Sequence, residues 1–121
     1  MSTVMPARIA RIDDKVGTIE TGRYADLFVL KGDAAQPFTT LANAEPQDVQ
    51  LVLIGGVPLF GSEKLMSRFK VKSEAVDVCG TSMRLNSAAL PDNTFAAVQH
   101  RLEGDLKEYG IPLAPLAECQ P

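Results

Sequence analysis

The chain carries few residues of the kinds that do acid–base or nucleophilic chemistry. Its one histidine, His100, lies in a predicted helix beside Arg101 and away from the apolar positions of that helix. This placement favours a solvated surface histidine over a general base. Cys79 and His100 could be written together as a thiol nucleophile and its base, but no third group is identifiable that would orient the histidine. A buried structural cysteine is the favoured interpretation of Cys79.

Two short strings match the spacing of known functional motifs. Ser67-Arg68-Phe69-Lys70 has the S-x-x-K spacing of serine acyl-transfer enzymes, which needs a helix to bring both side chains onto one face. We predict a strand here, which points the two side chains to opposite faces, and the companion S-D-N and K-T-G motifs are missing. Gly55 and Gly56 predict a turn and not a phosphate cradle, because no helix start follows them.

The charged residues also favour structural roles. Asp13 and Asp14 are adjacent in a predicted turn, where carboxylates accept hydrogen bonds from backbone amides, whereas a metal site needs ligands from several segments. We expect Asp26 to bond backbone groups at the start of a strand. A local positive strip consists of Lys64, Arg68, Lys70 and Lys72. A solvated strand face with edge-protecting lysines explains this strip, so we assign no catalytic, cofactor-binding or metal-binding residue.

Length and composition predict a single domain over residues 1–121. The chain has 121 residues, of which 45% are hydrophobic, which is enough for a real core. Its formal net charge of -3 argues against nucleic acid as the main partner. The apolar runs fall short of the roughly 20 residues that span a bilayer, and no secretory signal is present at the N-terminus. We therefore expect a cytoplasmic protein with no membrane or nucleic-acid partner.

The two cysteines, Cys79 and Cys119, lie far apart in the sequence. They match no metal-ligand spacing, and a secreted scaffold of this size would usually carry more cysteines. The sequence therefore predicts reduced thiols.

In the N-terminal half, apolar spacing predicts a short helix over residues 7–12, with Ser2 and Thr3 as caps and a turn at 13–15. Strands are expected at 16–20 and 25–30 around a Thr21-Gly22 turn. The second strand is apolar on both faces, which favours a central strand covered from both sides. Residues 31–47 have loop composition.

The clearest local signal is a hairpin formed by residues 49–54, Gly55-Gly56 and residues 57–60. Pro58 cannot donate to a ladder, so the returning strand is predicted at a sheet edge or with its nitrogen turned outward. Next come a helical turn at 64–66, a strand at 69–78 and an irregular stretch from Cys79-Gly80 to Pro91.

The last predicted element is an amphipathic helix over residues 94–109, with Asp92 or Asn93 as its cap and Gly110 and Pro112 at its end. Its apolar stripe is Phe95, Val98, Leu102, Leu106 and Tyr109. The predicted fold class is α+β and mainly β: a small β-sandwich-like sheet with a short N-terminal helix and this C-terminal helix.

The first half resembles the C-terminal section of the amidohydrolase superfamily. The resemblance rests on P-A-R at residues 6–8, D-D-K at 13–15 and G-T-I-E-T-G-R-Y-A-D-L-F-V-L at 17–30. Residues 49–61 resemble the later strand pair, V-x-x-V-x-x-G-G-x-x-x-x-G. Together these cover residues 6–61, which the resemblance assigns to sandwich strands, leaving 62–121 as an extension with a strand and the helix 94–109. The tail at 78–81 and 113–119 is similar to extensions in a bacterial subset.

What the resemblance implies is a non-catalytic role. In that family the chemistry, hydrolysis of C–N bonds in deaminases and amidases, sits in a (β/α)8 barrel of about 250 residues, which 121 residues cannot hold. Zinc or another divalent metal is expected only in a full-length parent, because the family's metal ligands lie upstream of the matched region. We therefore expect no cofactor in this chain and no activity from it alone; metal-dependent hydrolysis ranks third among the hypotheses.

Two hypotheses rank above it. In the first, the chain is the C-terminal sandwich part of an amidohydrolase, as a fragment or a short gene product, and supports a barrel. In the family the sandwich also uses N-terminal strands, so an apolar face should be open here, to be covered by a second copy or a barrel-containing partner. In the second, the domain is a free-standing binding module that uses the C-terminal helix and the loop at 31–47.

Overall fold

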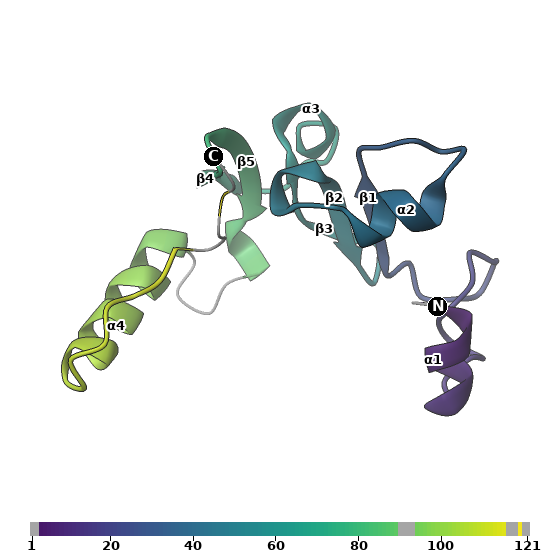
Figure 1. The fold of residues 1–121 in the computed structure, drawn as a ribbon, viewed down its shortest axis with the longest axis horizontal. Helices are drawn as coiled ribbons and strands as arrows, with labels where there is room; N and C mark the ends of the chain where they lie inside the picture. Colours follow the sequence, from purple (N-terminus) through teal and green to yellow (C-terminus); the bar gives the residue numbers. More distant parts are fainter. Residues whose placement is uncertain (1–2, 90–93, 116–118, 120–121) are drawn as a thin grey trace.

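The computed structural model describes residues 3–89, 94–115 and 119. The predicted α+β class is confirmed, with one five-stranded antiparallel sheet and a C-terminal helix (Figure 1). The described residues contain this sheet alone, so no second sheet faces it as in a sandwich. The elements in chain order are α1 (Val4–Ile9), β1 (Leu27–Leu30), α2 (Pro37–Ala42), η1 (Pro46–Asp48), β2 (Val49–Ile54), β3 (Val57–Ser62), α3 (Glu63–Met66), β4 (Ser73–Val78), β5 (Thr81–Asn86), η2 (Ser87–Ala89) and α4 (Phe95–Lys107).

The hairpin of β2 and β3 is confirmed, and the strand order is β1-β2-β3-β5-β4. Gly55 and Gly56 have φ values of 56° and 80°, the positive angles that a primed two-residue turn requires. The first alternative for the returning strand, a sheet edge, is wrong, because β5 pairs with the other side of β3. That pairing uses Phe60 to Ser62, so Pro58 lies outside it, and the Pro58 carbonyl accepts a hydrogen bond from Asn86 Nδ2 at 2.8 Å.

The segment after α3 differs most from the prediction. The helical turn at 64–66 is confirmed as part of α3, but residues 69–72 are not strand, and β4 begins at Ser73. The stretch predicted as irregular after Cys79-Gly80 contains β5, which pairs with both β4 and β3. Cys79 and Gly80 have φ values of 52° and 73°, so they form a second tight turn of the kind seen at Gly55-Gly56.

The N-terminal half is less regular than predicted. Thr3 is at the N-cap position of α1, as predicted, and the predicted cap Ser2 lies outside the described residues, but the helix ends at Ile9 instead of continuing to residue 12. Residues 16–18 form bends and residues 19–20 have no regular structure, so the strand predicted at 16–20 is not formed. β1 is an edge strand, not a central covered one, because only β2 pairs with it and Phe28 is 51% exposed. The expected loop at 31–47 contains the short helix α2.

The predicted C-terminal helix is confirmed as α4, with a different cap. Thr94 occupies the N-cap, where its side chain accepts a hydrogen bond from the Ala97 amide at 3.1 Å. The predicted caps Asp92 and Asn93 lie outside the described residues. At the far end Gly110 has a φ of 68°, and the Ile111 amide reaches back to the Leu106 carbonyl, as expected for a glycine-terminated helix.

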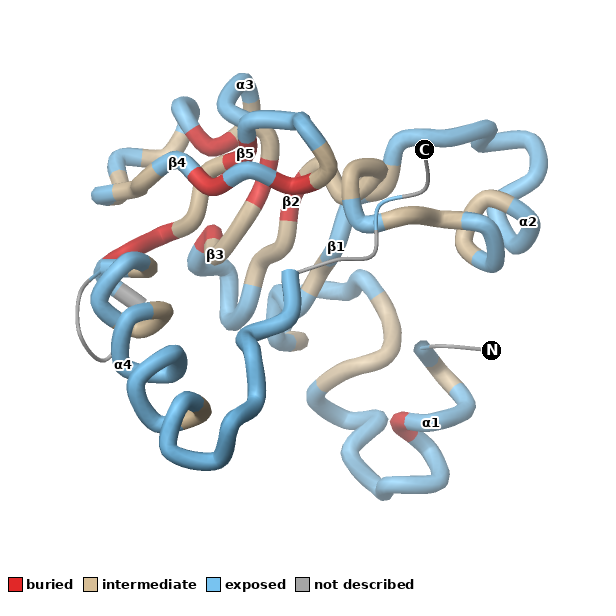
Figure 2. Tube along the Cα trace, turned by 60° about the vertical axis from the view of Figure 1, so that its left-hand side comes forward, coloured by how far each residue is buried: buried red, intermediate tan, exposed pale blue. Residues whose placement is uncertain are grey.

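The core lies toward the β4 side of the sheet. Val76, Val78 and Met83 form its buried cluster, against which Phe60 and Phe95, among others, pack. Figure 2 shows buried positions on the strands of the sheet, whereas the chain around α1 and α2 is mostly exposed. The hydrophobic core is therefore built largely from residues after residue 61, beyond the segment that resembles the amidohydrolases.

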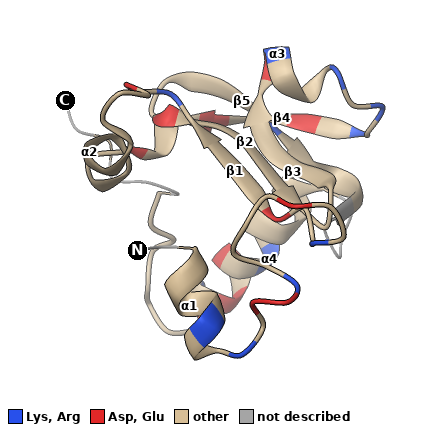
Figure 3. Cartoon of the chain, turned by 90° about the vertical axis from the view of Figure 1, so that its right-hand side faces the viewer, with Lys and Arg blue, Asp and Glu red and all other residues tan. Residues whose placement is uncertain are grey.

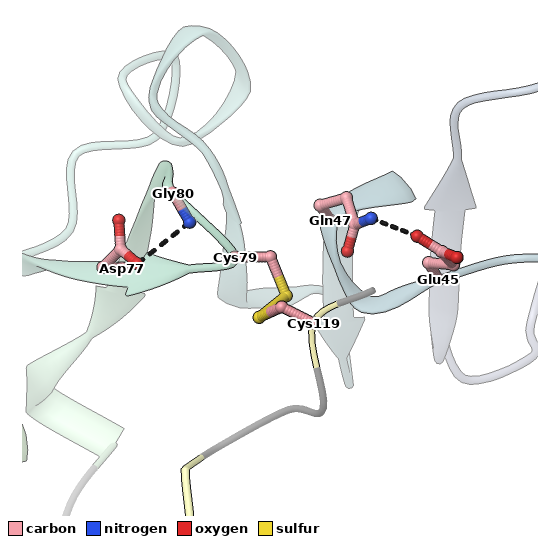
Figure 4. The surroundings of a disulfide bond; sticks show 6 residues. All are labelled: Glu45, Gln47, Asp77, Cys79, Gly80 and Cys119. Carbon is pink, nitrogen blue, oxygen red and sulfur yellow. Dashed lines mark hydrogen bonds between the residues drawn. A yellow bond between two sulfur atoms is a disulfide. The ribbon is translucent and has the colours of Figure 1, made fainter. Parts of the chain in front are cut away.

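The prediction of reduced thiols is wrong, because Cys79 and Cys119 form a disulfide (Figure 4). Their sequence separation is 40 residues and their Cα atoms lie 5.3 Å apart. Sequence spacing could not show this bond, because it depends on the segment after α4 running back along the helix toward the β4–β5 turn (Figure 1). None of the helices in the described parts of the chain is long and apolar enough to cross a membrane.

Candidate functional site

A large hollow lies beside the free edge of β1. It has a volume of about 830 Å³ and is bounded by α1, the bends at 16–19, β1 and α2. Its lining is mainly apolar and includes Ile12, Ile19, Tyr24, Phe28, Leu30 and Leu41. We call this hollow the β1 groove.

Hydrogen bonds at both ends fix β1 on the side away from the groove. At its start Asp26 Oδ1 accepts from the Gly55 amide at 2.6 Å, and the Ala25 carbonyl accepts from the Gly56 amide at 3.0 Å. At its end the Lys31 amide donates to the Asp48 carbonyl at 2.8 Å. The predicted role of Asp26 at a strand start is confirmed, and its partner is the turn of the β2–β3 hairpin.

The opposite edge of β1 is open. Because backbone hydrogen-bonding direction alternates along a strand, the N–H and C=O of Phe28 point away from β2. No strand among the described residues pairs with that edge. Phe28 is 51% exposed and Val29 is 45% exposed, and Figure 3 shows β1 and β2 without charged residues. This edge therefore combines free backbone groups with apolar side chains, without a charge that would discourage strand pairing.

The bends beside the groove owe their shape to α1. Gly17 has a φ of 103°, and a Cβ built at this glycine would lie 2.9 Å from the Cβ of Ala7. Ala7 is 4% exposed and is the buried residue of α1. This close approach requires a glycine and bends the chain where the sequence predicts a strand at 16–20.

The other candidate residues do not come together as a reactive site. His100 is exposed on α4, as expected, and Cys79 is half-buried and disulfide-bonded, so the two do not form a nucleophile and base. Ser67 is at the C-cap of α3, and Lys70 lies beyond the helix. The S-x-x-K string therefore has neither the predicted strand geometry nor the helical geometry that the motif needs.

The charged residues are placed as follows. Asp13 and Asp14 are exposed in a turn, and their predicted bonds to backbone amides stay a prediction. Within the described parts of the chain no group of three or more His, Cys, Asp or Glu side chains could hold a metal ion. The four residues of the positive strip are all exposed: Lys64, Arg68, Lys70 and Lys72. Because Lys70 and Lys72 precede β4, the strip is not the face of a strand.

The structure also has two smaller hollows. One, of about 410 Å³, lies between the start of the β1–β2 connection and α2, and there Thr40 Oγ1 exchanges hydrogen bonds with the backbone of Asp33. These bonds hold α2 to the end of β1, which is a structural role. The other, of about 470 Å³, lies between β4 and α4 and includes Cys79 and Cys119 in its lining. We call it the α4 groove.

Sequence comparison adds one finding. A model of the amidohydrolase family matches residues 1–59, just under half of the chain. The searches of curated proteins and of solved structures gave no match. The matched segment contains α1, β1, α2, β2 and the first half of β3, so it includes the whole of the β1 groove.

Proposed function

We propose that residues 1–59 are the flank of a metal-dependent hydrolase of the amidohydrolase type, and that they pack on the catalytic barrel without contributing catalytic residues. The observation that carries this proposal is the exposure of apolar side chains in the family-matching half. Of the large hydrophobic residues that are exposed, most lie in that half, and those that line the β1 groove include Ile19 at 86%, Tyr24 at 60% and Phe28 at 51%. Exposed apolar side chains clustered around a hollow are typical of an interaction surface.

The partner in this proposal supplies an extended strand to the β1 groove. A strand laid along β1 would pair with the free backbone groups of Phe28 and cover the side chains of Phe28 and Val29. Backbone pairing supplies affinity in such strand addition, and alternate side chains of the added strand fill the apolar hollow. The groove volume of about 830 Å³ leaves room for several such side chains.

The donor set of this chain does not fit the family's metal centre. Three or four converging ligands hold a zinc ion, and the described residues contain no such group. Both cysteines are bonded to each other, and His100 lies on the exposed side of α4. In this proposal, metal binding and the activation of water therefore belong to the barrel.

The test begins with the protein as it occurs in its source cells. An antibody raised against residues 94–109 is used to isolate it, and mass spectrometry identifies the peptides of every chain present. The proposal expects peptides of a barrel with an H-x-H motif and a later aspartate, either on the same chain or on a bound one. Recovery of this chain without any barrel peptides would contradict it.

A matched pair of variants then places the contact. Phe28→Lys puts a charge into the β1 groove, whereas Val57→Lys puts one at a similarly exposed residue of β3 that does not line the groove. We expect Phe28→Lys to lower barrel retention by about tenfold, the equivalent of about 1.4 kcal/mol, for one lysine left unsolvated in an apolar contact. Val57→Lys should leave retention unchanged. Equal loss in both variants would contradict a contact at the groove.

A second copy of the chain is the competing occupant of the same edge. Light scattering of the purified chain at micromolar concentration separates the two. A homodimer that Phe28→Lys converts to a monomer, with no barrel peptides in the native isolate, would favour self-association.

A further inference from the structure

The Cys79–Cys119 disulfide links the β4–β5 turn to the segment that follows α4. We propose that this bond is a redox latch, whose reduction releases α4 and the following segment from the sheet while the sheet stays folded. The latch lies in the part of the chain beyond the family match, and its function is independent of the β1 groove.

The position of Cys79 allows the bond to open without disturbing the sheet. Cys79 lies in the two-residue turn between β4 and β5, so it takes part in neither strand ladder. The turn has its own support, because Asp77 Oδ1 accepts a hydrogen bond from the Gly80 amide at 3.1 Å. The two strands pair along their full length from Ser73–Asn86 to Val78–Thr81. Breaking the sulfur–sulfur bond therefore removes no hydrogen bond of the sheet.

The N-terminal end of α4 is joined to the sheet by a hydrogen bond and by packing on the core. The Phe95 side chain packs on the core cluster, and its amide donates to Glu74 Oε1. Further along, α4 has no buried residue, and Leu102 is 44% exposed although it lines the α4 groove. The helix thus lies over a hollow of about 470 Å³ instead of packing closely on β4.

The segment that follows α4 is held to the β4–β5 turn by the disulfide. Figure 1 shows the chain after α4 running back along the helix toward the β4–β5 turn, and Figure 4 shows Cys119 meeting Cys79 there. On the way, Leu113 and Pro115 line the α4 groove together with Val98 and Leu102. Leu113 is still 37% exposed, so apolar packing of this segment is partial. A covalent bond at one end and the Phe95 anchor at the other together keep the groove covered.

The bond is open to attack by a dithiol. Cys119 is exposed, so a thiolate of the reductant can reach its sulfur. The attack forms a mixed disulfide with Cys119 and releases the Cys79 sulfur as a thiolate, which takes up a proton from solvent. The second thiol of the reductant then closes the reductant's own disulfide and releases Cys119. Two electrons pass from the dithiol to the protein, and the oxidised reductant leaves.

Hydrogen exchange followed by mass spectrometry tests the latch on the full chain, compared as oxidised protein and after treatment with dithiothreitol. We expect the rate of amide hydrogen exchange in residues 95–107 to rise by at least about tenfold on reduction, because the helix can open locally once the disulfide no longer tethers it. Exchange in β2, β3 and β5 should stay unchanged, and reoxidation should restore the protection of α4.

The variant Cys119→Ser is the matched control. It should show the fast α4 exchange without reductant and no response to dithiothreitol. If exchange in the sheet strands rose by the same factor as in α4, the proposal would be overturned, because the disulfide would then stabilise the whole fold. A Cys119→Ser variant that fails to fold would overturn it for the same reason. Unchanged α4 protection after reduction would overturn it as well.

Discussion

Gly61 lies in β3 at the centre of the sheet, and it should tolerate no side chain because the backbone of β2 lies too close. A Cβ at this position would lie 2.6 Å from the Gln50 carbonyl oxygen and 3.1 Å from the Leu51 Cα, both on the backbone of β2. Gly61 also pairs with Arg84 of β5, so β3 cannot move away from β2 without disturbing the other ladder. Overpacking of this kind costs about 1–3 kcal/mol. We expect Gly61→Ala to lower the free energy of unfolding by about 2 kcal/mol.

The matched control is Gly104→Ala, the same substitution where a Cβ meets nothing within 4 Å. Gly104 lies inside α4, where alanine is more favourable than glycine by about 0.5–1 kcal/mol. Urea denaturation of the oxidised protein, followed by circular dichroism, measures both changes, which should have opposite signs. A Gly61→Ala variant as stable as the parent would refute the reasoning, because it would mean that β2 and β3 are not held at the observed separation.

Three further substitutions probe the sheet core, the β1 anchor and the α4 cap. Met83→Ala removes a side chain that is 1% exposed in the core cluster, and urea denaturation should show a loss of about 2–5 kcal/mol. Asp26→Ala removes the acceptor of the Gly55 amide on an exposed surface, so we expect a loss of about 1 kcal/mol, with faster hydrogen exchange in β1 than in β5. Thr94→Ala removes the N-cap of α4 and should destabilise that helix by about 1 kcal/mol, seen as faster exchange in its first two turns; unchanged exchange there would show that the cap contributes nothing.

The sequence predicts those elements whose signals are local. Gly55-Gly56 between two apolar runs predicts the β2–β3 hairpin, because a primed turn needs positive φ at both residues. The apolar stripe of α4 and the Gly110 at its end predict that helix, because these signals also come from residues that are neighbours in the sequence. Asp26 is correctly placed because a short carboxylate before a strand commonly bonds backbone amides, although its partner, Gly55, lies 29 residues away.

The elements that were missed depend on contacts between distant segments. β5 follows a turn in which a cysteine, Cys79, occupies a left-handed conformation that usually belongs to glycine or asparagine, so the turn carries a weak sequence signal. Residues 16–20 precede the Thr21-Gly22 turn and so predict the first strand of a hairpin, but the packing of Gly17 on Ala7 bends them. The free edge of β1 and the disulfide were missed because both depend on which segments meet in space.

The resemblance predicts an open apolar face, and the β1 groove is an apolar hollow in the part of the chain that carries the resemblance. An open apolar face follows from the resemblance to a family whose sandwich uses strands from both ends of a longer chain. The structure locates that face at one edge of the sheet and bounds it with α1 and α2, two elements that local patterning describes only in part. Apolar composition alone could not decide between a covered central strand and an exposed edge strand.

The distribution of buried side chains separates folding from association. The buried cluster of Val76, Val78 and Met83 lies wholly beyond residue 59, whereas the family-matching half exposes Phe28 and Val29 at the sheet edge. A substitution in the cluster should therefore lower stability in any assembly state, and a substitution in the β1 groove should lower association while the purified chain keeps its stability. If Phe28→Lys instead lowered the free energy of unfolding of the purified monomer as strongly as Met83→Ala does, the groove would be part of the folding core, and its assignment to a partner would lose its basis.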